Sequence, residues 1–257
     1  MSSTKRVCYD LDSIRSVYEI TGYLVNETRL RIGSGKASSS FMETSDNPII
    51  RRNDKPYIPG SSLKGALRSL LEANVNNLYS EDKYKKVYTQ QDIKKAEDNK
   101  NLQDLTSCPG SDKVGYFCIP CIIFGYIDVS ARMYVFDAEV EGDFKIENYT
   151  SVAINRVLGG QNPGSLFTFD YISPGAKFKF KSLIYNVNLE KEDDDWRKQV
   201  RKGIIFVLRS LTEGIFIGGR KSVGAGFIKL VQPKIRSYKA DKGEWVDMEF
   251  KEVINKG

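Results

Sequence analysis

Two stretches of this sequence contain residues whose types and spacing could perform chemistry or bind a ligand: a glycine-rich loop that carries two adjacent cations, and a group of three cysteines. No chemistry here can use an imidazole, because the chain has no histidine. Ser-His-Asp and Cys-His nucleophiles, histidine-based ribonuclease pairs and histidine-rich zinc hydrolase sites are therefore excluded. Carboxylate, lysine, tyrosine or metal-assisted chemistry remains, as does binding without catalysis.

The glycine-rich loop covers residues 218–226, between a predicted helix and a predicted strand. Successive glycines let backbone N–H groups approach an anion without interference from a Cβ atom, and two cations add charge. The loop lies in a basic part of the chain, since residues 176–235 carry 13 Lys and Arg against 6 Asp and Glu. We therefore expect contact with RNA or another phosphate, and a purely structural turn is the alternative. The candidate residues are Gly218, Gly219, Arg220, Lys221, Ser222 and Gly224.

A second glycine-rich segment, GSGKASSS at residues 33–40, does not satisfy the phosphate-loop pattern G-x-x-x-x-G-K-[ST]. Leu30 stands where the first glycine is required, and Ala37 stands where a hydroxyl is required. Nucleotide hydrolysis at this segment is therefore rejected. Two interpretations stay open: a tight turn after a strand, or a backbone that approaches a nucleic-acid phosphate beside Arg31 and Lys36.

The three cysteines follow the pattern C-P-x8-C-x2-C, whose C-x2-C half is typical of a structural zinc site. They are Cys108, Cys118 and Cys121. Tetrahedral zinc requires a fourth ligand, which in this chain would come from Asp104, Asp112 or Cys8. Free thiols or an opportunistic disulfide are the alternative.

The composition is that of a globular protein, with 40% hydrophobic and 28% charged residues in 257. No apolar run approaches the roughly 18 to 20 residues of a membrane span, and the N-terminus lacks the apolar region of a signal peptide. We expect a cytoplasmic protein without a membrane partner. The net charge of +6 favours a polyanionic partner, although a basic surface without a partner is the alternative.

The elements that must position these residues are predicted from the periodicity of the apolar side chains. Strands are expected at 17–32, 132–140 and 177–189, helices within 57–74 and at 195–214, and a further strand after the glycine-rich loop. The first helix has Ser61 or Ser62 as its natural N-cap, and Lys64 and Arg68 share one of its faces. This order predicts an α+β fold with a modified ferredoxin-like (RRM-like) core and large insertions.

Five motifs, taken in order, resemble the RAMP superfamily of CRISPR proteins, and within it the Csm-type backbone subunit of type III effector complexes. They are SDNPIIR, PYIPGSSLKGALRSLLE, FGYIDVSARMYVFDAEV, INRVLGG and IGGRKSVGAGFIKL. The similarity extends from about residue 17 to residue 230. It implies a single RAMP domain over 1–257, with insertions at about 75–124 and at 141–175, the second forming a β-hairpin thumb.

The resemblance also implies the partners. Several such subunits stack along a CRISPR guide RNA, and the thumb of each interrupts the guide–target RNA duplex at a fixed interval. The expected partners are therefore guide RNA, target RNA, copies or paralogues of this chain, and other type III subunits, including the large polymerase/cyclase-like subunit.

The carboxylate that matches the residue with which the family cuts target RNA is Asp46. An unperturbed aspartate is a poor base at neutral pH, so Mg²⁺ or another divalent ion bound by Asp46 is the favoured mechanism. Judged from the sequence alone, Asp46 is a loop or Asx-turn residue before Pro48, and Glu43 is close enough to share or take its role. The alternatives to a metal-dependent endoribonuclease are a non-catalytic RNA-binding paralogue and a standalone guide-processing ribonuclease.

Further cations and an amide match positions that the family uses against RNA. The predicted contacts outside the glycine-rich loop are Arg31, Lys36, Arg51, Lys64, Arg68, Asn155 and Arg156. Lys64 and Arg68 equally suit an ordinary solvated helix face. Three aromatic side chains of the thumb region, Phe167, Phe169 and Tyr171, suit either packing within the thumb or stacking on bases.

Overall fold

The computed structural model describes residues 11, 14–34, 45–80, 117–126, 129–192, 195–239 and 243–255. Within them, helices and antiparallel strands are mixed, which confirms the predicted α+β class. The strands are β1 (Ser16–Asn26), β2 (Arg51–Arg52), β3 (Lys55–Ile58), β4 (Met133–Val135), β5 (Ala138–Glu141), β6 (Ile146–Ile154), β7 (Gln161–Ile172), β8 (Lys177–Tyr185), β9 (Ile215–Phe216), β10 (Phe227–Lys239) and β11 (Glu244–Met248). The helices are α1 (Gly60–Leu78), α3 (Ile119–Phe124), α4 (Asp195–Glu213) and α5 (Phe250–Asn255), with a short 3₁₀ helix at Lys221–Val223.

The main sheet has the strand order β11-β10-β1-β8-β5-β3-β2, with β4 also paired to β8 and β9 to β10. Strand β1 lies inside this sheet between β10 and β8, and its Leu24 pairs with Leu230 of β10 on one side and with Phe178 of β8 on the other. Because side chains alternate between the two faces of a strand, Ile20, Leu24 and Phe178 all face the helices and are fully buried.

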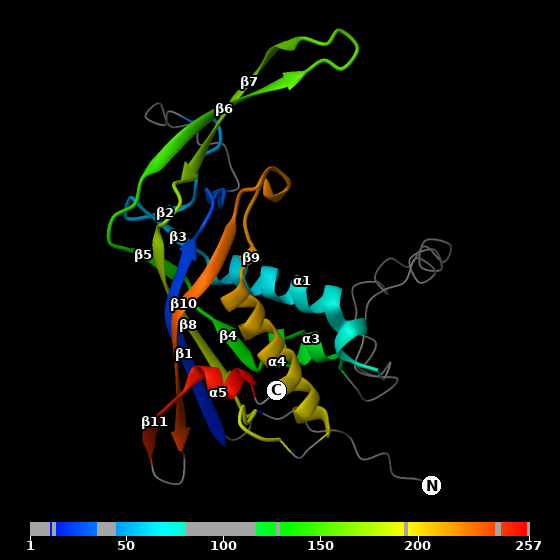
Figure 1. Ribbon diagram of the computed structural model, residues 1–257, viewed down its shortest axis with the longest axis vertical. Helices are drawn as coiled ribbons and strands as arrows, with labels where there is room; N and C mark the ends of the chain where they lie inside the picture. The colour runs from blue at the N-terminus through cyan, green and yellow to red at the C-terminus, as the bar shows by residue number, and fades with distance from the viewer. Residues whose placement is uncertain are drawn as a thin grey trace.

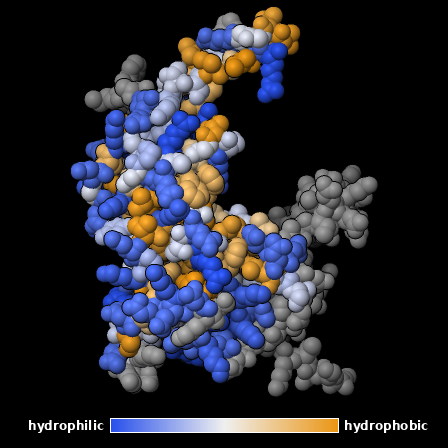
Figure 2. Space-filling model, viewed as in Figure 1, coloured by the Kyte–Doolittle hydropathy of each residue, from blue (hydrophilic) through white to orange (hydrophobic). Residues whose placement is uncertain are grey.

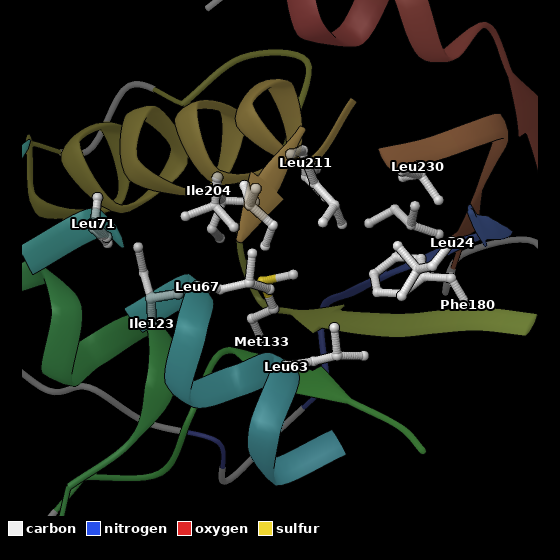
Figure 3. Packing of buried hydrophobic residues seen from close by; sticks show 14 of the residues in the cluster. Leu24, Leu63, Leu67, Leu71, Ile123, Met133, Phe180, Ile204, Leu211 and Leu230 are labelled. Carbon is white, nitrogen blue, oxygen red and sulfur yellow. The ribbon is translucent and has the colours of Figure 1, made fainter. Parts of the chain in front are cut away.

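Helices α1 and α4 cover one face of this sheet, with α3 beside them, and α5 lies near β11 at the lower end (Figure 1). Helix α1 presents Leu63, Leu67 and Leu71 at helical spacing, and all three are fully buried. Figure 3 shows these leucines directed at side chains from α3, α4 and the sheet, among them Ile123 and Ile204. Burial of each such side chain contributes about 1.5–3 kcal/mol, so this cluster holds both helices on the sheet.

A two-stranded hairpin of β6 and β7 projects from one end of the molecule, away from the helices (Figure 1). Three of its apolar side chains near the turn are largely exposed, Ile154 at 67%, Val157 at 93% and Leu158 at 82%. Figure 2 shows hydrophobic surface gathered at the end of this hairpin. The hairpin therefore carries an apolar end that the chain itself does not cover within the described residues.

Two predictions about local structure are wrong. Neither Ser61 nor Ser62 caps α1, because the helix begins at Gly60 and Pro59 holds the N-cap position without a side-chain bond. Asp137 supplies the acceptor instead, since its Oδ1 accepts a hydrogen bond from the Gly60 N–H at 2.8 Å. The expected strand at 132–140 is interrupted at Phe136 and Asp137, and forms the two strands β4 and β5.

Candidate nucleic-acid interface

Asp46 lies in the loop before β2 and is bound to Thr168 of β7 by three hydrogen bonds. The carboxylate oxygen Oδ2 accepts from the Thr168 backbone N–H at 2.8 Å and from its hydroxyl at 3.0 Å. The same hydroxyl accepts a hydrogen bond from the Asp46 N–H at 2.9 Å. The predicted catalytic carboxylate is thus fixed to the base of the projecting hairpin.

These bonds favour the charged form of the carboxylate and use only one of its two oxygens. The hydrogen bonds from the backbone and then the hydroxyl of Thr168 lower the pKa of Asp46 below its ordinary value, so it is ionised at neutral pH. The residue is exposed. The bonds from Thr168 all use Oδ2 and leave Oδ1 outside this contact. An exposed anionic oxygen therefore faces solvent from a fixed position.

The neighbours of Asp46 anchor the same loop to the main chain of β7. The Ser45 hydroxyl donates to the Thr168 carbonyl at 3.3 Å, and the Asn47 amide donates to it at 3.2 Å. In return, the Asn47 carbonyl accepts from the Asp170 N–H at 3.3 Å. The loop is therefore paired to the hairpin along three consecutive residues.

The polar face of the β7 base continues with Asp170, which is 4% exposed. Arg51, a predicted RNA contact, lies 3.5 Å from the Asp170 carboxylate and is itself exposed at 41% of its side chain. One oxygen of Asp170 has no hydrogen-bond partner among the described residues. A buried carboxylate in this position requires a cation nearby, and Arg51 serves that purpose.

The opposite face of the β7 base is aromatic and is covered by arginines. Phe169 contacts Phe167 and Tyr171 edge to face, with ring centroids 5.3 and 6.5 Å away. The guanidinium carbons of Arg31 and Arg220 lie 4.9 and 4.5 Å from the Phe169 ring centre. This arrangement favours packing within the hairpin base over base stacking for Phe169.

A third arginine joins this face. The guanidinium carbon of Arg29 lies 4.7 Å from the ring centre of Tyr149 in β6 and 4.8 Å from that of Tyr171. Each cation–π contact contributes roughly 0.5–2 kcal/mol, depending on its exposure. The segment after β1 and the glycine-rich loop together hold the hairpin from the side opposite to Asp46.

Close backbone approaches explain two glycines of the glycine-rich loop, one against the segment after β1 and one within the loop itself. A Cβ at Gly218 would lie 2.2 Å from the Arg31 carbonyl oxygen, and one at Gly226 would lie 2.0 Å from the Ile217 oxygen. Both residues also have positive φ, +73° and +91°. The Gly219 N–H donates to the Arg31 carbonyl at 2.9 Å, so it is occupied within the protein. Lys221, Ser222 and Gly224 are exposed.

A groove of about 720 Å³ lies between α1, the end of α4 and the glycine-rich loop. Small residues form its α1 side, and Lys221 from the loop supplies a cation, although Glu213 adds one acidic group. The lining residues are Ser61, Ser62, Gly65, Ala66, Ser69, Leu70, Ser210, Glu213, Gly214, Ile215, Phe216, Gly218 and Lys221. Small side chains and hydroxyls of this kind admit a polymer backbone closely and offer hydrogen bonds to it.

The two cations of α1 have different surroundings. Arg68 donates to the Glu72 carboxylate at 2.8 Å, to the Gly125 carbonyl at 2.9 Å and to Cys121 Sγ at 3.2 Å. Lys64 is half-buried and has no ion pair among the described residues. Lys64 is consequently the better candidate for an RNA contact, and the role of Arg68 stays a prediction.

Asn155 and Arg156 lie at the far turn of the hairpin, away from Asp46. The Asn155 side chain accepts from the backbone N–H groups of Val157 and Leu158, at 2.9 and 3.1 Å, and so shapes the turn. Arg156 is exposed. The structure therefore brings Arg31, Arg51, Asp46 and the glycine-rich loop together around the hairpin base, but not these two residues.

Several predicted residues lie outside the described part of the chain: Lys36, Glu43, Cys108, Asp104, Asp112 and Cys8. Cys118 and Cys121 are described and buried at the start of α3. Within the described ranges, no group of three or more His, Cys, Asp or Glu side chains could hold a metal ion. The zinc site stays a prediction that no observation supports. Separately, no helix in the described residues is long and apolar enough to cross a membrane.

Three residues of the candidate site escape the sequence predictions: Thr168, Asp170 and Arg29. The signal for the first two was the alternation in Phe167-Thr168-Phe169-Asp170-Tyr171, which places the two polar residues on one face of a strand. Nothing in that alternation indicates that Asp46, 122 residues earlier, is their partner. Arg29 follows β1 without a motif.

Comparisons with known proteins agree with the motifs. Residues 23–229 match the RAMP superfamily. The chain is 30% identical over 93% of its length to the CRISPR system Cms endoribonuclease Csm3 of Methanothermobacter thermautotrophicus, covering 95% of that protein. It is 29% identical over 84% of its length to the protein of the same name from Methanocaldococcus jannaschii, covering 79% of it. It is 28% identical over 85% of its length to the Mycobacterium tuberculosis protein of that name, covering 88% of that protein.

Proposed function

The chain belongs to the RAMP superfamily, and on that basis we propose that it is a guide-RNA-binding backbone subunit of a type III CRISPR complex that cuts target RNA through Asp46. The guide RNA, the target RNA, further copies or paralogues and other type III subunits are its proposed partners. The similarity to Csm3 endoribonucleases over most of both chains supports this assignment.

We also propose that the core is of the ferredoxin-like type. The strand order β10-β1-β8-β5, with α1 after β1 and α4 after β8, supports this interpretation. On this interpretation, the β6–β7 hairpin is the thumb, inserted between β5 and β8. Its exposed apolar end suits a wedge between stacked base pairs.

The observation that carries the proposal is the attachment of Asp46 to the hairpin base. If the hairpin interrupts a guide–target duplex, a carboxylate bound to Thr168 of β7 is held at a fixed position relative to that interruption. A fixed position of this kind accounts for cleavage at one place for each subunit, because catalysis depends strongly on orientation.

RNA supplies its own nucleophile, since the 2′-hydroxyl adjacent to the scissile phosphate can attack it. The chain then has to hold the RNA backbone in line and help to neutralise the negative charge that develops on the phosphate. Asp46 fits a hard divalent cation, because its ionised Oδ1 is exposed and Mg²⁺ often takes only one or two protein carboxylates. When bound, such an ion would neutralise charge that develops on the phosphate.

A general-base role for Asp46 is less favourable in this geometry than the sequence alone indicates. The two Thr168 donors lower its pKa further below neutrality, and a weaker base accepts a proton less readily.

The lining of the groove beside α1 supports a path for the guide RNA there, because Lys221 lies at one side of the groove and Lys64 lies on helix α1.

The test is cleavage of a target RNA by the reconstituted complex in which this chain carries Asp46→Asn. We expect the cuts governed by this subunit to disappear while guide and target RNA remain bound, because the amide keeps the shape but lacks the charge. Cuts retained at the same positions would make the chain a non-catalytic backbone paralogue.

A further inference from the structure

Thr168 makes contacts to Asp46 that no other residue duplicates within the described chain. Its hydroxyl accepts a hydrogen bond from the Asp46 backbone N–H and donates one to Asp46 Oδ2. A single side chain therefore binds both the backbone and the carboxylate of the aspartate. Its backbone N–H adds a second donor to Oδ2. Thr168 comes from β7, 122 residues away from the loop that it fixes.

The effect of these bonds is to select one orientation of the carboxylate. An exposed aspartate on a loop is free to rotate about χ1 and χ2. Two donors on Oδ2 restrict that rotation and leave Oδ1 outside the contact with β7. The β-branched threonine is itself stiff at χ1, so its hydroxyl is presented in a narrow range of positions.

The loop is also attached to β7 by bonds that do not involve the hydroxyl. Ser45 and Asn47 bind the main-chain carbonyl of Thr168, and the Asp170 N–H binds the Asn47 carbonyl. None of these three bonds uses the threonine side chain. The hydroxyl of Thr168 bonds to Asp46, whereas its carbonyl holds the two neighbours of Asp46 in the loop.

We infer that Thr168 is the positioning residue for Asp46: its hydroxyl orients the carboxylate so that Oδ1 faces the scissile phosphate of the RNA. The inference rests on the proposed function and adds to it a residue from the thumb hairpin itself. It follows that the register of β7 and the position of the cutting carboxylate are coupled, because the same strand forms the wedge and holds Asp46.

The experiment compares three variants of the full chain in the reconstituted complex. Thr168→Val removes the hydroxyl but keeps the branched shape and the backbone N–H, whereas Thr168→Ser keeps the hydroxyl. Thr150→Val is the matched control, since Thr150 lies directly across the hairpin from Thr168, is exposed and is not bonded to Asp46. Single-turnover cleavage, RNA affinity and the Mg²⁺ concentration for half-maximal rate are measured for each.

We expect Thr168→Val to slow cleavage by about 10- to 100-fold and to raise the Mg²⁺ requirement, with RNA affinity unchanged. Thr168→Ser should stay within about 3-fold of the wild type, and Thr150→Val should match it. Wild-type cleavage by Thr168→Val, while Asp46→Asn is inactive, would overturn the inference and leave the proposed function intact.

Two other outcomes also decide the matter. Equal losses in Thr168→Val and Thr168→Ser, accompanied by weaker RNA binding, would show that Thr168 supports the hairpin and does not orient Asp46. Normal cleavage by Asp46→Asn would contradict the proposed catalytic role of Asp46 itself, because no carboxylate would then need to be positioned.

Discussion

Arg220 and Lys221 are adjacent in the sequence, yet the structure gives them different surroundings. Arg220 is half-buried and its guanidinium lies over Phe169 at 4.5 Å, whereas Lys221 is exposed at the edge of the α1 groove. The two cations that the sequence treats as one pair therefore have separate roles. Arg220 holds the hairpin base, and Lys221 is available to a phosphate.

This difference predicts that Lys221→Ala weakens RNA binding and reduces the slope of log Kd against log salt by about 0.7 to 1, as expected for one lost phosphate contact. Lys251→Ala on α5, at the end of the molecule opposite to the hairpin, is the control and should leave the slope unchanged. The measurement is RNA affinity at several salt concentrations. A slope that Lys221→Ala does not alter would show that this lysine does not touch phosphate.

At the scale of elements, the glycine-rich loop requires glycine only at certain positions. Gly218 and Gly224 both have positive φ, at +73° and +80°. An added Cβ at Gly218 would meet the Arg31 carbonyl, whereas one at Gly224 would meet nothing within 4 Å. Gly218 therefore allows the loop to pack against the segment after β1, whereas no neighbouring atom restricts the side chain at Gly224.

We expect Gly224→Ala to cost about 1–2 kcal/mol of unfolding free energy, from the left-handed backbone alone. Gly218→Ala should cost more than roughly 3 kcal/mol, because the clash with a carbonyl adds to the same penalty. Chemical denaturation of both variants measures the difference. Equal costs would mean that the loop does not press against Arg31.

Strand β1 carries a buried glutamate, Glu19, on the face of the sheet opposite to the helices. Glu19 is 8% exposed and accepts from Lys181 and Arg236 at 2.8 and 2.7 Å. Burial by itself would raise the pKa of Glu19, but the hydrogen bonds from the two cations outweigh it and leave the pKa below its ordinary value. Glu19 therefore links β1 to both neighbouring strands as a carboxylate.

A lowered pKa in the folded state means that the stabilisation is complete above the ordinary glutamate pKa and is lost as the pH falls through the folded value. Glu19→Gln should then cost about 1–2 kcal/mol at pH 7, and this difference should shrink below about pH 4. Glu27→Gln, which breaks an exposed pair with Lys229 at 2.9 Å, should cost less than about 1 kcal/mol. If Glu19→Gln lowered the free energy of unfolding equally at all pH values, the stabilisation would not come from the charged carboxylate.

Local signals were enough to predict the main elements but not their junctions. The leucine stripe of α1 and the alternation of β8 each follow from periodicity, and both elements formed as expected. The α1 cap failed because its acceptor, Asp137, is 77 residues away. The partner of Asp46 was missed for the same reason, since a bond to Thr168 exists only once the hairpin has folded.

On the scale of the whole molecule, the hairpin is held from two sides. Arginines from the segment after β1 and from the glycine-rich loop cover its aromatic face, and the Asp46 loop pairs with its polar face. Three segments that are far apart in the sequence thus meet at one hairpin base. The proposed wedge and the proposed cutting carboxylate are consequently joined through the same hairpin base.

In the proposed mechanism, an ionised Asp46 at the hairpin base cuts the target RNA with a divalent ion. The most direct measurement is the single-turnover cleavage rate of the reconstituted complex as a function of Mg²⁺, for the wild type and for Asp46→Asn, at saturating target RNA. We predict a wild-type rate that rises with Mg²⁺ and vanishes on chelation, and a rate at least about 100-fold lower for Asp46→Asn at every concentration. Mg²⁺-dependent cleavage by Asp46→Asn at the wild-type rate would contradict the claim.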